Sequence, residues 1–520
     1  MRLPYKHWGQ NGRVNGIFLT CKLTVHRTIP DTEQLPLALY RAEQVRLFDR
    51  IAIEECGLDG AALMQTAGEA VFAAMLGRWP ALQHITVLCG TGNNAGDGFV
   101  IAQLARAADI EVTVLQLGDA SRLQGDAKVY ADQVRDLTED FAGDLPRRTD
   151  LIIDALLGTG LERDVEGSWA VAIEAMNARA APTVSVDIPS GLSSDRGAIL
   201  GVAVRAQLTV TFIGLKQGLF TGQGPACSGD IVFNGLSVPA KVYARSILSA
   251  RRLDYGKIIP LLSPRSRVSH KGMFGHVLVV GGDHGFAGAA RLAAEAALRC
   301  GAGLVSVATR ESHISALVSA RPELMVHAVE DVALLDALLH RASVVVIGPG
   351  LGRETWGQQM LGCVLDSGKP LVVDADALNL IAGEPTRSDR WVITPHPGEA
   401  ARLLQVSTTD IEQDRFQAAR DLQSRYGGAV VLKGAGTVVA SSNGRLAVCS
   451  DGNPGMATAG MGDVLSGVIG ALLAQGLSLD EAADAGVTVH ANAADRAVTL
   501  GQRGLIASDL FPHLRTLVNP

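Results

Sequence analysis

Short apolar segments rich in β-branched residues recur along this 520-residue chain, and stretches with helical spacing separate them. In the first half, the apolar segments occupy residues 84–89, 112–117, 151–157, 183–188 and 208–213. Helical stretches between them include residues 99–108 and 169–178. Strands that are apolar on both faces and alternate with helices indicate an α/β fold with a covered parallel sheet. Ligands bind beyond the carboxyl ends of such strands, so we expect functional sites there.

The same alternation restarts in the second half. Strands are expected at residues 276–280, 304–308, 343–347, 370–374, 391–394 and 430–433. Helices are expected at residues 288–299, 332–339, 356–365, 397–404, 414–426 and 480–498. Residues 236–270 break this rhythm and are rich in Arg, Ser and Pro, which is typical of a domain junction. Because the chain is too long for one core, we expect three segments. They are a loose extension over 1–35 and two domains over 36–245 and 246–520.

Charge, the length of apolar runs and cysteine content exclude several classes of protein. The formal net charge is −7, so the chain lacks the excess of Lys and Arg that neutralises nucleic-acid phosphates. No apolar run approaches the roughly 18 residues that cross a membrane. The seven cysteines are scattered without a C-x-x-C pair, which is typical of a reducing compartment. We therefore expect a cytoplasmic protein that binds neither nucleic acid nor membrane.

A glycine-rich loop over residues 452–462 leads into an apolar helix expected at 464–473, with Asp463 at the junction. The start of a helix offers free backbone N–H groups and partial positive charge to an anion. Gly460 and Gly462 let the backbone approach such a ligand closely. Asp463 is then either a base for a substrate hydroxyl or a helix N-cap, and this loop alone favours neither.

Polar residues also follow the strands of the first half. Asn93, Asn94 and Asp97 lie in the loop 90–98, which we expect to precede a helix. Asp154, Asp187 and Ser190 lie in or directly after the strands expected at 151–157 and 183–188. Taken one at a time, such residues can be helix caps or loop hydrogen-bond partners. Taken together, they offer oxygen ligands to a hard cation, and one carboxylate with an amide and a hydroxyl suits a monovalent ion.

These motifs, with V-D-I-P-S-G at 186–191 and the stretch Thr211 to Gly224, resemble the amino-terminal domain of the YjeF family, NAD(P)H-hydrate epimerase. The resemblance covers about residues 36–240 and implies a Rossmann-like parallel sheet. It implies that K⁺ is held by Asn94, Asp154 and Ser190. We further expect Asp187 to perform acid–base catalysis in this domain. The residues implied to hold the hydrated nucleotide are Asn93, Asn94, Ala95, Gly96, Asp97, Gly158, Thr159, Gly160, Leu161, Glu162, Arg163, Asp164 and Asp187. Ala95 stands where the family usually has glycine.

The second half carries T-P-H-P-G-E at 394–399, L-K-G-A-G-T at 432–437 and the glycine-rich loop around Asp463. These motifs resemble the carboxy-terminal YjeF domain, the ribokinase-like ADP-dependent NAD(P)H-hydrate dehydratase, over about residues 250–515. The resemblance implies ADP with Mg²⁺ as co-substrate. Our hypothesis is that Asp463 is the catalytic base, which deprotonates the substrate hydroxyl. The residues implied to contact the hydrate are Ala289, Gly350, His396 and Asp463. Those implied to hold the adenine nucleotide are Lys433, Gly434, Ala435, Gly436, Thr437 and Gly462.

Two of these residues have other interpretations at this stage. His396 can be a structural cap, and Lys433 can be a solvated surface lysine. The function implied by the resemblance is repair of NADHX and NADPHX. One domain interconverts the R and S hydrates, and the other dehydrates the S form with release of AMP and phosphate. A homo-oligomer is also expected. The alternative is a ribokinase-like small-molecule kinase joined to a non-catalytic amino-terminal binding module.

Overall fold

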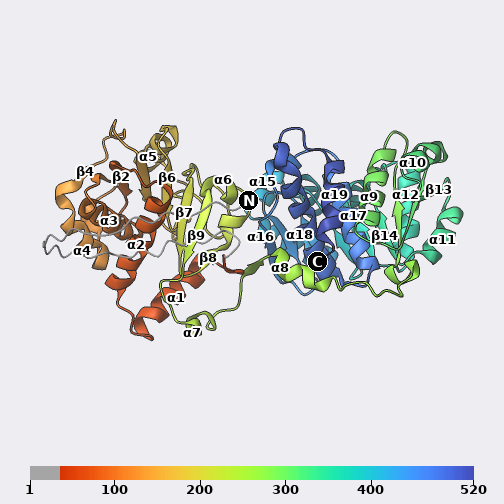
Figure 1. Cartoon of the computed structure of the whole chain (residues 1–520), viewed down its shortest axis with the longest axis horizontal. Helices are drawn as coiled ribbons and strands as arrows, with labels where there is room; N and C mark the ends of the chain where they lie inside the picture. Colours follow the sequence, from red (N-terminus) through yellow and green to blue (C-terminus); the bar gives the residue numbers. More distant parts are fainter. Residues whose placement is uncertain (1–34, 520) are drawn as a thin grey trace, which may run out of the picture.

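The computed structural model describes residues 35–519 of the chain. These residues form two α/β bodies that lie side by side, the first coloured red to yellow and the second green to blue (Figure 1). The extension expected over 1–35 lies outside the described residues, save for Leu35. No helix of the described part is both long and apolar enough to cross a membrane.

The first body is built on a fully parallel seven-stranded sheet in the order β4-β3-β2-β5-β6-β7-β9. Its strands are β2 (His84–Cys89), β3 (Glu111–Gln116), β4 (Thr138–Asp140), β5 (Leu151–Ala155), β6 (Thr183–Val186), β7 (Leu208–Phe212) and β9 (Asp230–Asn234). Its helices are α1 (Ala42–Glu54), α2 (Gly60–Arg78), α3 (Asn93–Ala107), α4 (Gly125–Gln133), α5 (Gly167–Ala178), α6 (Gly224–Ser228) and α7 (Ala240–Tyr243). The predicted parallel sheet is thus confirmed.

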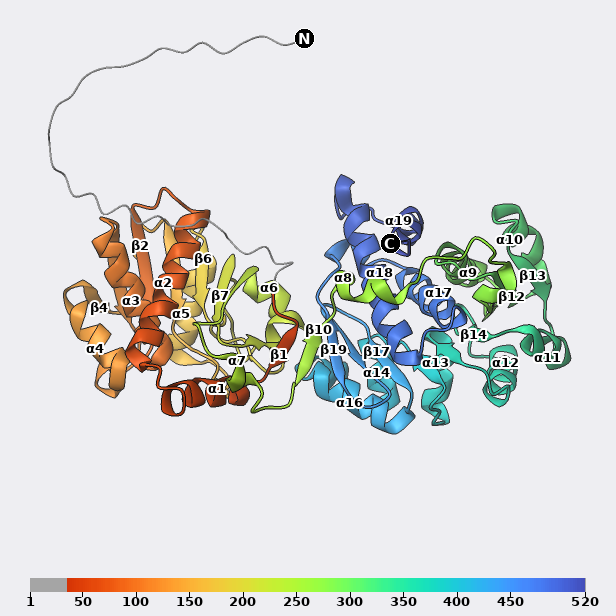
Figure 2. The same ribbon diagram turned by 60° about the horizontal axis from the view of Figure 1, so that its bottom comes forward.

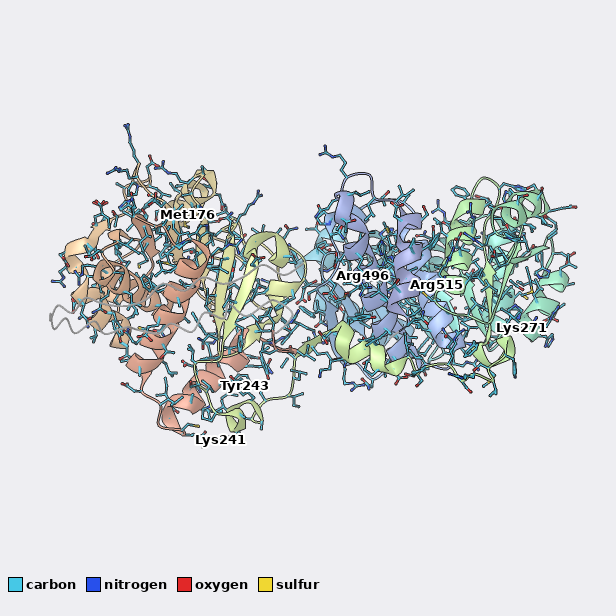
Figure 3. All side chains as sticks on the ribbon, in the orientation of Figure 1. Met176, Lys241, Tyr243, Lys271, Arg496 and Arg515 are labelled. Atoms are coloured by element: carbon cyan, nitrogen blue, oxygen red, sulfur yellow. The ribbon has the colours of Figure 1, made fainter. Side chains whose placement is uncertain are left out.

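Helices bury both faces of this sheet, as its doubly apolar strands require. Met176 of α5 belongs to the core on one face (Figure 3). Tyr243 of α7 packs on the opposite core, where its ring centroid lies 5.2 Å from that of Phe48 in α1 (Figure 3). The carboxyl ends of the strands are left for the loops that carry the polar motifs.

The second body is built on a larger mixed sheet in the order β13-β12-β11-β14-β15-β16-β17-β18-β19-β10-β1-β8. Its strands are β11 (His276–Val280), β12 (Leu304–Thr309), β13 (Met325–Ala328), β14 (Val344–Ile347), β15 (Leu371–Val373), β16 (Trp391–Ile393), β17 (Ala429–Leu432), β18 (Thr437–Ala440), β19 (Leu446–Cys449) and β10 (Ala250–Arg252). The segment from β13 to β17 is parallel, and β18 lies antiparallel to both of its neighbours.

Its longer helices cover both faces of the sheet and include the one that begins at the glycine-rich loop. They are α9 (Ala287–Arg299), α11 (Val332–Arg341), α12 (Thr355–Asp366), α13 (Ala375–Gly383), α14 (Pro397–Leu404), α16 (Arg415–Tyr426), α17 (Met461–Ala474) and α18 (Leu479–Ala497). The shorter ones are α8 (Tyr255–Ile258), α10 (Ile314–Ala320), α15 (Thr408–Gln413) and α19 (Phe511–Leu517).

Two strands from the first half of the chain complete the sheet of the second body. They are β1 (Ala38–Tyr40), which pairs antiparallel with β10, and β8 (Leu215–Lys216), which pairs parallel with β1. Figure 2 shows β1 and β10 between the two bodies. The two halves therefore share one hydrogen-bonded sheet across their junction.

The prediction of a loop over residues 90–98 is wrong, because α3 begins at Asn93. Asn94 and Asp97 therefore lie in the first turns of a helix. Glycine disfavours helices, but packing outweighs that preference here. A Cβ atom at Gly96 would lie 2.4 Å from Met64 Sδ, and one at Gly98 would lie 2.7 Å from Ala155 Cβ. These glycines let α3 pack tightly against α2 and the sheet.

Candidate active sites

A cleft of about 840 Å³ lies beyond the carboxyl ends of the strands of the first body. Its walls come from α1, α3 and the loops that follow β5 and β6. The charged or amide side chains that line it include Asp49, Asn93, Asn94, Asp97, Asp187 and Lys216. The cleft thus lies at the edge of the sheet where the sequence predicts a ligand site.

Asp187 is bound to a buried lysine at the floor of this cleft. Its Oδ1 atom accepts hydrogen bonds from Thr211 Oγ1 and Phe212 N, both at 3.1 Å, and from the ammonium group of Lys216. The Lys216 side chain is fully buried, whereas Asp187 keeps 18% of its side chain exposed to the cleft. Asp187 also has a φ of 66°, a left-handed conformation that is uncommon outside glycine and is enriched at functional sites.

Lys216 was missed as a site residue by the sequence reasoning, although it lies within the stretch Thr211 to Gly224 on which the resemblance rests. Two further carboxyl groups face the pair. Burial raises the pKa of Asp97 well above its usual range, and the charges of Asp187 and Asp49 raise it further. Burial and Asp187 also raise the pKa of Asp49. The cleft therefore holds two carboxyl groups with raised pKa values beside one that is paired with an ammonium.

Asp154 lies next to the cleft and has an environment suited to a cation. It is fully buried, and its oxygens accept hydrogen bonds from Ser185 Oγ at 2.7 Å, Ser190 N at 2.8 Å and Ser190 Oγ at 2.6 Å. Burial raises its pKa, and the Ser190 hydrogen bonds oppose that rise. Among the described residues, no Lys, Arg or His forms an ion pair with it.

The carbonyl oxygen of Leu157 joins the three residues that the resemblance assigns to K⁺. It lies 3.3 Å from Asn94 Nδ2 and 3.3 Å from Ser190 Oγ. Asn94, Asp154 and Ser190 are thus brought together with a backbone carbonyl, and all their available ligand atoms are oxygens once the amide is turned. One carboxylate, one amide, one hydroxyl and one carbonyl are ligands of the kind that a monovalent cation accepts.

The other predicted residues of the first site fall into two groups. Most of the loop after β5 lines the cleft, namely Gly158, Thr159, Gly160, Leu161, Arg163 and Asp164. Glu162 is not among the lining residues, and Ala95 and Gly96 are buried inside α3, away from the cleft. Only the backbone of these last two can serve the ligand, through the helix start.

In the second body, Asp463 lies in the first turn of α17 and is not its N-cap. The N-cap is Gly460, whose φ is 87°, and no side chain caps this helix. Burial raises the pKa of Asp463 to about 7, and the nearby Asp374 contributes to the rise while Lys433 opposes it. A carboxyl group of this kind can accept a proton at neutral pH.

Lys433 is held beneath the start of α17 by a buried carboxylate. Its Nζ atom lies 2.7 Å from Asp374 Oδ1, whose second oxygen accepts a 2.8 Å hydrogen bond from Ser466. A Cβ atom at Gly462 would lie 3.2 Å from Lys433 Nζ, so the lysine ammonium lies close against the backbone at the start of α17. Lys433 has only 19% of its side chain exposed and is therefore not a solvated surface lysine.

A second carboxyl group reaches the same lysine. Glu399 Oε2 lies 3.8 Å from Lys433 Nζ. Burial raises the pKa of Glu399 to about 7, with Lys433 opposing the rise and Asp374 adding to it. Neither Asp374 nor Glu399 was predicted as a site residue, although Asp374 ends a predicted strand and Glu399 ends the motif T-P-H-P-G-E. The second body thus gathers three carboxyl groups around one ammonium.

His396 acts as the N-cap of α14, so the structural interpretation of this residue is correct. Its Nδ1 atom accepts hydrogen bonds from Gly398 N at 3.0 Å and from Glu399 N at 3.4 Å. This assigns the ring proton to Nε2. About half of the side chain is exposed, which leaves the ring free to contact a ligand as well.

The remaining predicted residues of the second site lie in two separate groups. Ala289 and Gly350 are neighbours, since a Cβ atom at Gly350 would lie 3.3 Å from Ala289 Cβ. Gly434, Ala435 and Gly436 form the turn from β17 to β18, and Thr437 begins β18. This turn follows Lys433 directly.

Replacing Lys433 by Met should destabilise the protein by about 3 kcal/mol, because Asp374 is left buried without its counter-charge. Urea denaturation measures the loss. The double variant Lys433→Met, Asp374→Asn removes both charges and should recover part of it. A double variant no more stable than Lys433→Met would contradict this explanation.

Comparisons with known proteins cover nearly the whole chain. A family model described as YjeF-related protein N-terminus matches residues 60–218, and one described as NAD(P)H-hydrate dehydratase matches residues 277–515. A "Bifunctional NAD(P)H-hydrate repair enzyme Nnr" from Coxiella burnetii is 48% identical over 93% of this chain and 99% of its own length. The protein of the same name from Escherichia coli is 45% identical over 96% of this chain and 97% of its own length.

Among solved structures, an ADP/ATP-dependent NAD(P)H-hydrate dehydratase from Bacillus subtilis, co-crystallised with ATP and Mg²⁺, is 28% identical. The match covers 51% of this chain and 95% of that one, with a TM-score of 0.47.

Proposed function

The chain belongs to the family of bifunctional NAD(P)H-hydrate repair enzymes, and from this premise we propose that it repairs NADHX and NADPHX at two separate sites. In these hydrates, water has added across the C5–C6 double bond of the reduced nicotinamide, and hydride transfer is lost. The proposal assigns epimerisation of the R and S forms to residues 36–245. It assigns ADP-dependent dehydration of the S form to residues 246–520.

The observation that carries the dehydratase proposal is Asp463, a half-buried carboxyl group with a pKa raised to about 7 beside the fixed ammonium of Lys433. As Asp463 takes the proton from the C6 hydroxyl of the hydrate, the hydroxyl oxygen bonds to the β-phosphorus of ADP. The bond between that phosphorus and the AMP oxygen breaks. Phosphate then leaves C6, a proton leaves C5, and the double bond re-forms. This route replaces a poor leaving group, hydroxide, by phosphate.

The surroundings of Asp463 suit phosphoryl transfer. Backbone N–H groups at the start of α17, over Gly460 to Gly462, can stabilise charge on the moving phosphoryl group. Lys433 adds a positive charge whose position is fixed by Asp374. The proposed hydrate contacts are Ala289, Gly350 and His396, and the proposed ADP contacts are Gly462 and the segment Lys433 to Thr437.

The epimerase proposal rests on the cleft of the first body. Epimerisation at C6 requires the C6–O bond to break and to re-form on the opposite face of the ring. The Asp187–Lys216 pair performs this acid–base work: a proton passes from the pair to the departing oxygen, which leaves as water, and returns to the pair from the water that adds. Lys216 holds the Asp187 carboxylate in place. Nucleotide contacts are proposed for the start of α3, over residues 93–97, and for the loop 158–164.

We propose K⁺ as the ion of the first site, because Asp154 is buried, pairs with no Lys, Arg or His of residues 35–519, and lies against the hydroxyl oxygens of Ser185 and Ser190. Asn94, Asp154 and Ser190 would hold it, and its charge would balance the carboxylate and fix the start of α3 against the loop after β5. Mg²⁺ is proposed to enter the second site on ADP, since Mg²⁺ usually binds substrate phosphates with one or two carboxylates.

Dehydration should lose about tenfold in rate for each pH unit below about 7, because the base must be deprotonated and Asp463 has a pKa near 7. A profile of kcat/KM against pH measures this limb. Glu399 titrates in the same range, so Glu399→Gln is the matched variant. The limb should stay in that variant, and its disappearance would reassign it to Glu399.

The products separate this proposal from the kinase alternative. The repair reaction yields AMP, phosphate and a reduced nicotinamide nucleotide that is not phosphorylated further. A small-molecule kinase instead yields a stable phosphorylated alcohol. Chromatography of a reaction of the purified protein with hydrate and ADP distinguishes the two, and accumulation of a phosphorylated hydrate would overturn the dehydratase assignment.

We also propose that the protein works in the cytoplasm. Its cysteines at positions 56, 89, 227, 300, 363 and 449 are free, which suits a reducing compartment. Assembly into a homo-oligomer stays a prediction.

A further inference from the structure

One short segment of the first body reaches both candidate sites. It begins at β8 with Lys216, which binds Asp187 in the first cleft. A 3₁₀ turn follows over Gln217–Phe220, and the segment ends at Thr221, which contacts the turn between β17 and β18 in the second body. Only five positions separate these two contacts in the sequence. The segment therefore connects the two sites through the backbone.

Thr221 bears directly on the segment Lys433 to Thr437. It is fully buried, and its hydroxyl donates to the carbonyl oxygen of Gly436 at 2.7 Å. The next residue, Gly222, donates its N–H to Ala435 O at 3.1 Å. A Cβ atom at Gly436 would lie 1.8 Å from Phe220 O, so the two backbones are in close contact. The first body thus contacts the backbone of the turn between β17 and β18 and holds it in place.

Arg415 of α16 fixes the other end of the same turn. Its side chain is only 1% exposed, and its Nη2 atom donates to Lys433 O at 2.9 Å and to Leu432 O at 3.2 Å. Its Nε atom donates to Thr221 Oγ1 at 3.1 Å. The guanidinium group therefore binds the second body's turn and the first body's threonine at once. Its position is set by both bodies.

We propose that Thr221 and Arg415 are positioning residues for the dehydratase, and that the first body forms part of the support for the ADP-binding turn. This inference rests on the proposed function, in which Lys433 to Thr437 bind ADP. A turn with three glycine or alanine residues loses much conformational freedom when it orders on a ligand. Holding it in place beforehand removes that cost, so the effect belongs to ADP affinity and not to the hydrate.

Thr221→Val removes the hydroxyl and keeps the shape of the side chain. Without this hydroxyl the turn is less ordered before ADP binds and must be ordered on binding, so we expect the Kd and the KM for ADP to rise about tenfold. The KM for the hydrate should stay unchanged, as should epimerisation. Thr221→Ser keeps the hydroxyl and should restore ADP binding. Titration calorimetry with ADP on the full chain measures Kd without turnover.

The matched control is Thr209→Val. Thr209 is also fully buried and donates to one backbone carbonyl, that of Ser228 at 2.7 Å, but it makes this bond within the first body. It should leave ADP binding unchanged. If Thr221→Val lowers the folded fraction, Arg415→Lys provides the same test. It keeps the positive charge but removes the guanidinium group that links Thr221 to the turn.

The outcomes separate this inference from the proposed function. Equal ADP affinity in the wild type, Thr221→Val and Thr209→Val would overturn the positioning role. A parallel rise in the KM values for ADP and hydrate would also overturn it, because that result indicates a general structural defect. A wild-type chain that binds ADP but does not dehydrate the hydrate would instead overturn the proposed function. In that case the Kd values for ADP of the wild type and the variants still test the positioning role of Thr221.

Discussion

Replacing Asp463 by Asn is expected to reduce dehydration of the S hydrate roughly a thousandfold and to leave epimerisation at the wild-type rate. Asn keeps the size of the side chain but cannot take the proton from the C6 hydroxyl. The recovery of reduced-nicotinamide absorbance with ADP measures dehydration, and the conversion of one hydrate epimer into the other measures epimerisation.

The fold should tolerate this change, because α17 is capped by the backbone at Gly460 and not by Asp463. Asp331→Asn is the matched control. Asp331 is the N-cap of α11 and accepts hydrogen bonds from Ala333 N and Leu334 N. Asn is as good a cap as Asp, so both activities should survive in that variant. A comparable loss of both activities in Asp463→Asn would contradict the model of two separate sites.

Replacing Asp187 by Asn is expected to reduce epimerisation roughly a hundredfold or more, while dehydration of the S hydrate continues at the wild-type rate. Asn cannot exchange a proton with the C6 oxygen. It does fit the backbone, because Asn tolerates the positive φ of 66° found at this position. The conversion of purified R hydrate to the S form measures the loss.

The Asp187 variant leaves Lys216 buried without its counter-charge, which is destabilising. The double variant Asp187→Asn, Lys216→Met removes both charges and should recover thermal stability without recovering epimerisation. Asp195→Asn is the control, because Asp195 accepts a 2.7 Å hydrogen bond from Ala42 N outside the cleft. Recovery of epimerisation in the double variant would show that Asp187 acts through stability alone.

Local sequence pattern predicts the strands well, because each strand is buried on both faces and leaves a continuous apolar run. Strands β2 and β11 match their predicted ranges, and β5 to β7 end one or two residues early. The start of α3 was missed because its glycines meet Met64 and Ala155, and such packing partners are distant in sequence. The same is true of β1 and β8, whose pairing across the junction has no local signal.

In the candidate sites too, residues in local motifs were predicted and residues that depend on distant contacts were missed. Asp187 at a strand end and Asp463 at a glycine-rich helix start were predicted because their motifs are local. Asp49 was missed because it comes from α1, far from the strand ends that it faces. Thr221 and Arg415 were missed because each gains its role from a partner about two hundred positions away. Long-range contacts between elements therefore set the limit of what the sequence predicts.

The most direct test of the central claim gives the purified full chain R hydrate as the sole substrate, with ADP. Two sites acting in sequence should return reduced nicotinamide from the R form, with one AMP released for each molecule repaired. Asp187→Asn should repair the S form but recover the R form only as fast as it epimerises without protein. If the wild-type chain repairs the S form and leaves the R form untouched, the first site is not an epimerase, and the account of two cooperating sites is contradicted.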